Sequence, residues 1–143
     1  MKKILLLIFA VFITLQLSAQ PPEGFNPKRF QQEMEQFITR EAGLTPAEAA
    51  RFFPIFNELQ QKQRKLFDKM RFMRFVNTND DAAAHKAIVE MDRLDLQIKK
   101  LQQQYHEKFC KVLPAGKVLK IIKADEMFHR TAFKRFVKKH SMR

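Results

Sequence analysis

The sequence contains two pairs of residues whose side chains can bind metal ions, and the two members of each pair are about one helical turn apart. His106 and Cys110 form one pair, and Glu126 and His129 form the other in an E-x-x-H arrangement. At these spacings two side chains share one face of a helix and could hold one ion. A closed site needs about four ligands, however, and helical bundles usually carry E-x-x-H on two helices. Because the motif occurs once, we predict no metal or cofactor and interpret Glu126 and His129 as residues at a core edge.

Other catalytic arrangements are missing from the sequence. It has three glycines, no Gly-rich phosphate loop, no G-x-S-x-G and no paired cysteine motif. The four histidines form no recognisable constellation with a nucleophile. We therefore predict that the protein is not an enzyme. Cys110 is the single cysteine, so an internal disulfide is excluded, and we interpret Cys110 as a partly buried small hydrophobe that could pair with another molecule in an oxidising compartment.

The residues from Thr45 to Leu113 read as two long amphipathic helices separated at Asn77-Thr78-Asn79-Asp80. Apolar positions recur at alternating steps of three and four, which is typical of a coiled-coil seam. Folding back at the turn would bury both stripes together, so the pattern predicts a long antiparallel helical hairpin. The two stripes are Phe52, Phe56, Leu59, Gln63, Leu66, Met70 and Met73, and Ala84, Ala87, Met91, Leu94, Ile98, Leu101, Tyr105 and Val112.

Shorter segments flank this pair. Asn26 and Pro27 predict a helix start and Gly43 predicts its end. We therefore predict an all-α fold with helices near 27–41, 45–76, 80–113 and 115–139, forming a single domain over 27–140. On the last helix we expect one apolar stripe, with Glu126 and His129 among its members: Val118, Leu119, Ile122, Phe133 and Phe136.

The N-terminus has the pattern of a cleaved leader. Lys2 and Lys3 precede an apolar run, and Leu17-Ser18-Ala19 resembles a processing site, so we predict a signal peptide over 1–19 and a flexible lead-in over 20–26. The run is too short for a membrane span, which predicts a periplasmic protein without stable membrane insertion. Without the two leader lysines the net charge is +10. For an exported protein with such a basic surface, we expect envelope lipids, polyanions or unfolded polypeptide as partners and not nucleic acid.

Charged residues on the outer face of the second long helix are also spaced as ion pairs. Asp95 with Lys99, and Glu107 with Lys111, stand four residues apart with the acid first. This order supports an isolated helix, so we expect both pairs to form.

A sharp helix-start signal occupies residues 44–48, with sequence Leu-Thr-Pro-Ala-Glu. Thr45 can cap the backbone N–H of Glu48, Glu48 can reach back to Thr45, and Pro46 fits the first helical position. A degenerate copy follows the second long helix; it begins at Leu113 and Pro114, ends at Lys117, and lacks both the threonine and the glutamine. A helix start explains the first copy by itself.

These motifs, with the leader and the order of helices, resemble the LTxxQ motifs of the Spy/CpxP family of bacterial periplasmic proteins. Glu48 stands where that family usually has glutamine. The resemblance implies a cradle-shaped helical homodimer that in several members holds unfolded proteins without ATP. Other members are stress or metal sensors that modulate membrane signalling proteins.

The end of the first long helix carries the best candidate binding residues. Phe72 and Phe75 point almost opposite the predicted seam and stand among Lys69, Arg71 and Arg74. Aromatic rings surrounded by cations suit exposed apolar and acidic segments of unfolded or stress-damaged envelope proteins. Burial under another helix or a dimer mate is the structural alternative. Further along the chain, Leu96 interrupts a polar face and is a weaker candidate for the same surface.

The sequence therefore favours an ATP-independent, periplasmic, chaperone-like protein. The alternative is a stress- or metal-responsive accessory that docks on a membrane sensor kinase or an anti-sigma factor. The two functions differ in their partners: many unrelated unfolded proteins in the first, one folded signalling protein in the second.

Overall fold

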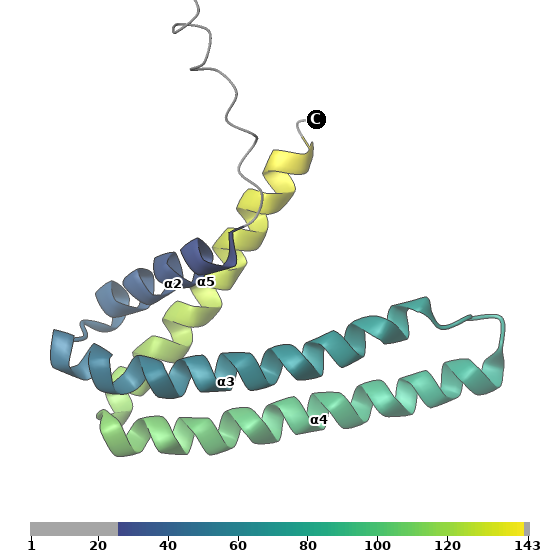
Figure 1. Ribbon diagram of the computed structural model, residues 1–143, viewed down its shortest axis with the longest axis horizontal. Helices are drawn as coiled ribbons and strands as arrows, with labels where there is room; N and C mark the ends of the chain where they lie inside the picture. The colour runs from purple at the N-terminus through teal and green to yellow at the C-terminus, as the bar shows by residue number, and fades with distance from the viewer. Residues whose placement is uncertain (1–25, 142–143) are drawn as a thin grey trace, which may run out of the picture. The chain divides into compact units, whose positions relative to one another are not determined.

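The computed structural model describes residues 26–141, and every regular element in that range is helical (Figure 1). The elements in chain order are α2 (Pro27–Ala42), α3 (Pro46–Phe72), the short 3-10 helix η2 (Met73–Phe75), α4 (Asp81–Val112) and α5 (Ala115–Ser141). The all-α class and the four predicted helices are confirmed. The helix predicted over 45–76 is shorter than expected, because the chain tightens into η2 after Phe72.

The chain divides into two compact units, one up to Gln32 and one from Glu33 onward. The first contains only the opening residues of α2 within the described range. The predicted signal peptide, 1–19, and all but the last residue of the lead-in lie outside the described residues. In the part that the structure describes, no helix combines the length and apolarity that crossing a membrane requires.

Local hydrogen bonds fix both ends of α2. Asn26 Oδ1 accepts a hydrogen bond from the backbone N–H of Arg29 at 3.1 Å, which caps the first turn. Gly43 has φ +62°, and the N–H of Leu44 donates to the carbonyl of Thr39 at 3.0 Å. This is the geometry of a Schellman end, in which glycine adopts the left-handed conformation that other residues avoid.

The starts of α3 and α4 are capped by side chains. Thr45 Oγ1 accepts from the N–H of Glu48 at 3.2 Å, and Glu48 Oε2 accepts from the N–H of Thr45 at 2.9 Å, so the predicted capping box is present. Asp80 Oδ1 accepts from the N–H of Ala83 at 3.0 Å. Each bond satisfies a backbone donor that the helix leaves free.

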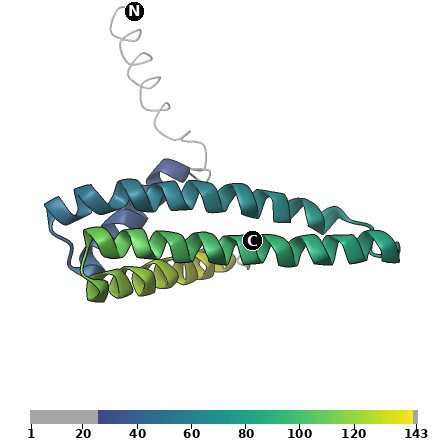
Figure 2. The same ribbon diagram turned by 90° about the horizontal axis from the view of Figure 1, so that it is seen from below.

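Helices α3 and α4 lie side by side and run in opposite directions (Figures 1 and 2). Near the start of α3, the Phe52 ring centroid lies 4.8 Å from that of Phe109, near the end of α4. Further along both helices, Lys62 Nζ donates to Tyr105 Oη at 2.7 Å. The buried residues of the two helices are Phe52, Phe56, Leu59 and Gln63 of α3 and Ala87, Leu94, Ile98, Tyr105 and Phe109 of α4.

Burial between α3 and α4 decreases toward η2. Leu66, Met70 and Met73 are half-buried, although they continue the same stripe as the fully buried Phe52 and Phe56. On α4 the expected seam residue Met91 is exposed. At 100° per residue it has the same angular position as Phe109, eighteen residues further on, which is buried, so its exposure reflects its place near the turn and not its side of the helix. The part of the stripe next to η2 is consequently only partly covered.

Helix α5 buries a different face from the one we predicted. Its buried residues are Val118, Ile121, Ala124 and Phe128, and the Phe128 ring lies 5.6 Å from that of Phe37 on α2. Of the predicted stripe only Val118 is buried and Ile122 is half-buried, whereas Leu119, Phe133 and Phe136 are exposed. The helix carries two apolar stripes, and the one that begins at Val118 and continues through Ile121 faces the core.

The ion pairs also differ from the expected ones. Among the described residues, the two expected pairs do not form: the side-chain nitrogen of Lys99 is more than 4 Å from the Asp95 carboxylate, and that of Lys111 is more than 4 Å from the Glu107 carboxylate. Pairs form elsewhere, including Glu58 with Lys62 at 2.7 Å. The hydrogen bonds that Lys62 donates to Glu58 and then to Tyr105 raise its pKa to about 12. An exposed ion pair at helical spacing contributes only about 0.3–0.5 kcal/mol to stability. The sequence spacing therefore determines only weakly which acidic and basic side chains pair.

Candidate functional site: the aromatic end of α3

The candidate binding residues lie where α3 gives way to the turn before α4. Helix α3 ends at Phe72 and tightens into η2, which is closed by the N–H of Val76 donating to the carbonyl of Met73 at 3.3 Å. Asn77 Oδ1 then accepts from the N–H of Asn79 at 3.0 Å. Asparagine side chains stabilise such turns by bonding to the backbone two residues on. The turn therefore holds the end of α3 in a defined position.

Both predicted aromatic residues are open to solvent in the single chain. The exposed fraction is 69% for Phe72 and 82% for Phe75. Neither ring takes part in the ring contacts among described residues. We refer to the two rings with their neighbouring cations, Lys69, Arg71 and Arg74, as the tip surface. Two large exposed aromatics three residues apart are unusual unless something covers them.

The cations of the tip surface differ in how freely they can take an external partner. Arg71 Nη2 lies 2.6 Å from Asp68 Oδ1, so it already has a carboxylate partner. Lys69 and Arg74 have no carboxylate within 4 Å among the residues that the structure describes. Arg74 is thus available to acidic groups of another molecule. Lys69 is close enough to Glu90 to contribute to the lowered pKa of that carboxyl, but it forms no ion pair and can also take an external partner.

Leu96 is exposed as expected but does not join the tip surface. Its exposed fraction is 71%. It lies fifteen residues after Asp81, the first residue of α4, and is therefore about 22 Å along the helix from the turn. Leu96 is thus a separate exposed position.

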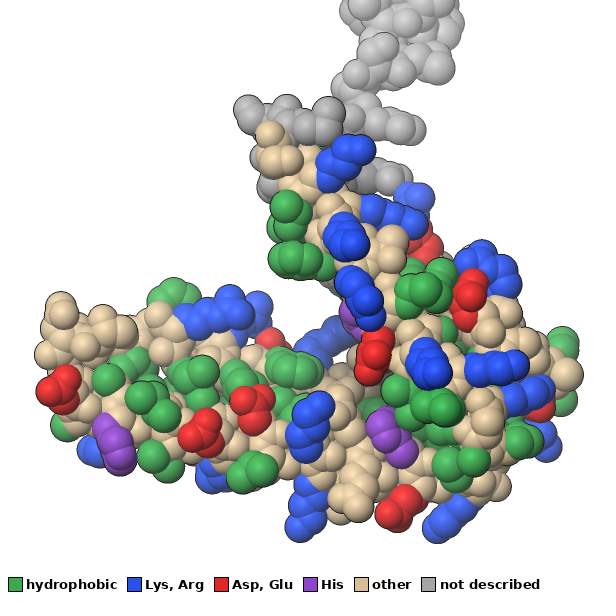
Figure 3. Space-filling view, turned by 180° about the vertical axis from the view of Figure 1, so that it is seen from behind, with side chains coloured by type: hydrophobic (Ala, Val, Ile, Leu, Met, Phe, Trp, Pro, Cys, Tyr) green, Lys and Arg blue, Asp and Glu red, His purple; other side chains and the backbone are tan. Residues whose placement is uncertain are grey.

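Several exposed apolar residues near this end were not predicted from the sequence. Phe67, Ile88 and Val89 are each more than half exposed. Phe67 directly follows the seam residue Leu66, and Ile88 directly follows Ala87. The sequence feature that could have indicated their exposure is that each is a bulky apolar residue just outside the predicted stripe. Figure 3 shows hydrophobic side chains in a row along α3 and α4, with charged side chains of both signs around the row.

The two copies of the short motif meet each other. Leu44 and Leu113, their first residues, are both buried. Lys117, which ends the second copy, donates to Glu48, which ends the first, with Nζ at 2.7 Å from Oε1 and 2.6 Å from Oε2. Lys117 also donates to the carbonyl of Gly43 at 3.2 Å. The hydrogen bonds from Lys117 and from the Thr45 backbone lower the pKa of Glu48.

The prolines of the motif lie at the helix starts as predicted. Pro46 is the first residue of α3. Pro114 directly precedes α5, and its carbonyl accepts from the N–H of Lys117 at 2.9 Å and from that of Val118 at 3.1 Å. The motif residues therefore serve helix initiation and the contact between the starts of α3 and α5.

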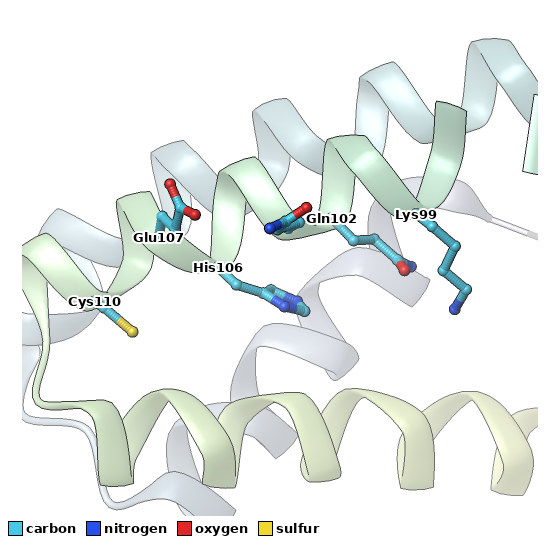
Figure 4. Close-up of a pocket in the computed structure, with 6 residues that line it drawn as sticks. Lys99, Gln102, His106, Glu107 and Cys110 are labelled. Atoms are coloured by element: carbon cyan, nitrogen blue, oxygen red, sulfur yellow. The ribbon is translucent and has the colours of Figure 1, made fainter. Parts of the chain in front are cut away.

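One pair of possible metal ligands lies on α4. His106 and Cys110 line a pocket of about 460 Å³ together with Lys99, and these three project from one side of the helix, while Glu107 points to another side (Figure 4). Burial, and then the charge of Lys99, lowers the pKa of His106 and so favours the neutral imidazole. Lys99 would repel a cation at the same place.

Cys110 itself is exposed, so the prediction that it is partly buried was wrong. The physical reason is helical geometry. Phe109, the preceding residue, occupies the buried face of α4, and the next position is turned by about 100° from it. The pairing of the thiol with another molecule stays a prediction.

The other pair of possible ligands lies on α5. Glu126 is exposed, and His129 Nε2 lies 3.3 Å from Asp125 Oδ1. That Asp125 oxygen is buried, and the contact with His129 is an ion pair when the imidazole is protonated. The interaction with Asp125 raises the pKa of His129, while burial opposes the shift. Within residues 26–141 no three His, Cys, Asp or Glu side chains gather around one point, so the four residues form two separate pairs.

Comparison with known proteins identifies no relative. No family model, no curated protein sequence and no solved structure matches the chain. The resemblance to the Spy/CpxP family therefore stays a prediction that depends on the motif residues and the order of helices.

Proposed function

We propose that this protein is an ATP-independent, periplasmic holding chaperone of the Spy/CpxP type. The observation that carries the proposal is the tip surface, where Phe72 and Phe75 are exposed at 69% and 82% beside Lys69 and Arg74. Unfolded proteins present apolar segments that these rings can cover. The cations attract the acidic segments of the same chains and speed the encounter.

The partly covered stripe next to the tip surface supports the same function. Met70 and Met73 are half-buried there, and Met91 on α4 is exposed. Methionine side chains are flexible and adapt to differently shaped partners, which suits a protein with many clients. Many weak apolar contacts also permit release without a nucleotide, because no single contact dominates the affinity.

The proposed assembly is a homodimer in which α3 and α4 form the long hairpin of a cradle. A pair of long helices is thin and leaves apolar residues outside, including Ile88, Val89 and Leu96 on α4. A second copy covering the outer apolar residues of α4 would add the buried area that a thin helical pair lacks. Sedimentation equilibrium of the secreted form tests this part directly.

The test of the holding function uses the secreted form that begins at Gln20, which retains every residue that the structure describes. Aggregation of three unrelated unfolding proteins is followed by light scattering without ATP. We expect suppression near a one-to-one ratio of chaperone to client. Failure with all three would contradict the proposal and favour the accessory function, in which the protein binds one folded signalling partner.

A pair of variants locates the binding surface. Phe72→Ser with Phe75→Ser should abolish most of the suppression while circular dichroism and the thermal midpoint stay unchanged, because both rings are exposed. Leu119→Ser with Phe133→Ser is the matched control, since it also removes two exposed apolar side chains, but from α5. Equal loss of activity in both would show that apolar surface in general, and not the tip surface, holds clients.

A further inference from the structure

The C-terminal half of α5 has an exposed apolar side that the holding function does not use. Phe133, Phe136 and Val137 are exposed at 68%, 60% and 46%. At 100° per residue these three positions fall within an arc of about 100°. The buried residue Phe128 lies outside this arc, so the face that packs on the core is a different one. The arc is therefore an apolar face directed to solvent.

The rest of this helical segment is strongly basic. From Met127 to Ser141 the sequence contains no Asp or Glu, and its basic residues are Arg130, Lys134, Arg135, Lys138 and Lys139. Arg130, Lys134 and Lys138 follow one another at intervals of four and form one row beside the apolar arc. Within the described range none of these three has a carboxylate within 4 Å. The row thus presents unneutralised charge.

Charge and apolarity together select the partner. A row of unpaired cations is complementary to a surface of anionic phosphates, which nucleic acids and lipid headgroups share. A nucleic-acid backbone offers no apolar surface that could cover the three exposed apolar side chains on the neighbouring arc. A bilayer offers such a surface, because phenylalanine rings can enter the boundary between headgroups and acyl chains while lysines stay among the phosphates. This is the composition of helices that lie in a membrane interface.

We propose that the segment of α5 from Met127 to Ser141 is an interfacial amphipathic helix that docks the protein on a bilayer containing anionic phospholipid. The helix lies on the surface, in keeping with the finding that no described helix could span a bilayer. Each cation near such a surface strengthens partitioning roughly fivefold, so the row of three supplies about a hundredfold. Docking would place the tip surface of the same molecule close to the envelope membrane.

The chain has no tryptophan, so one introduced at this face is a unique probe. We would prepare Phe133→Trp in the secreted form and mix it with vesicles of phosphatidylcholine containing phosphatidylglycerol, or with vesicles of phosphatidylcholine alone. The proposal predicts a blue shift of the emission with the anionic vesicles only. Phe75→Trp, at the tip surface, is the matched probe and should shift much less. An equal shift with neutral vesicles, or none with either, would overturn the proposal.

Charge variants in the Phe133→Trp background separate lipid docking from general binding of polyanions. Lys134→Gln with Lys138→Gln should weaken partitioning about 25-fold. Lys86→Gln with Lys100→Gln has the same net charge but alters exposed lysines of α4, and it should leave partitioning largely unchanged. Vesicle binding without any blue shift, or a shift of equal size with an oligonucleotide, would assign the row to polyanions in general and overturn the interfacial helix.

Discussion

Lys117 and Glu48 occupy the last positions of the two motif copies and bond to each other through both carboxylate oxygens, at 2.7 and 2.6 Å. The family motif that the sequence resembles has glutamine at this position, and here the two copies carry opposite charges instead. Glu48 therefore has a partner 69 residues away in the chain. The pair connects the beginning of α3 to the beginning of α5.

A double-mutant cycle measures this connection. Glu48→Gln keeps an acceptor for the Thr45 backbone but removes the charge, and Lys117→Met removes the donor while keeping the length of the side chain. Each single variant should lower the thermal midpoint, and the double variant should lower it by less than the sum, because the second change has no partner left to lose. Strictly additive shifts would show that the contact contributes nothing.

The aromatic cluster between α3 and α4 should dominate stability. Phe52 is completely buried and its ring lies 4.8 Å from that of Phe109. Phe52→Ala removes that packing and leaves a cavity, so we expect a loss of about 3–5 kcal/mol in the free energy of unfolding, measured by denaturant titration. Phe75→Ala removes an exposed ring and should change it by no more than about 0.5 kcal/mol. A large loss for Phe75→Ala would mean that its ring is covered in solution.

Two glycines provide a matched test of backbone conformation. Gly43 has φ +62°, and a Cβ added there would meet nothing within 4 Å, so Gly43→Ala should cost about 1–2 kcal/mol from conformation alone. Gly116 has equal space but lies in the first turn of α5. Gly116→Ala should therefore be neutral or should stabilise by up to about 1 kcal/mol. The measurement is the free energy of unfolding of both variants by chemical denaturation. An equal change in that free energy for the two variants would show that backbone conformation is unimportant.

The contact between His129 and Asp125 should make stability depend on pH. Because the folded-state pKa of His129 is raised, its contribution is fully present below the unfolded value of about 6.5 and is lost as pH rises through the higher folded value. His129→Gln should therefore lower the thermal midpoint more at about pH 5.5 than at about pH 8.

His106 provides the opposite control. Its folded-state pKa is lowered, so stability falls as pH drops through about 6.5 toward that lower value. His106→Gln should accordingly raise the thermal midpoint on the acid side relative to the unchanged protein. Thermal melts across this pH range that respond in the same way to both substitutions would contradict these assignments.

The helix ends were predictable because their causes are local. Asn26, Gly43, Thr45 and Asp80 each act within a few residues, so the sequence around them contains the whole signal. The direction of Phe72 away from the seam was predictable too, since an α-helix fixes which side faces away from a seam. Whether another helix or a second copy covers Phe72 and Phe75 was left open by the sequence, and in the single chain both rings are exposed.

The buried face of α5 was not predictable in the same way. Val118 belongs to two apolar stripes, one through Ile121 and Phe128 and one through Ile122 and Phe133, and helical periodicity favours neither. Packing against other helices makes the choice, including the contact of Phe128 with Phe37. The meeting of Glu48 with Lys117 is likewise a product of tertiary arrangement, although the paired motifs offered a hint.

The decrease in burial along α3 and α4 implies a gradient in how readily the backbone opens. Amide hydrogens beside Phe52 and Phe109 would exchange with solvent only in rare global excursions, whereas those beside Met70 and Met73 would exchange through small, frequent ones. The end of the helix pair next to η2 should therefore open while the end that contains Phe52 and Phe109 stays closed. Under the proposed holding function, this would let the tip surface adapt to clients of different size.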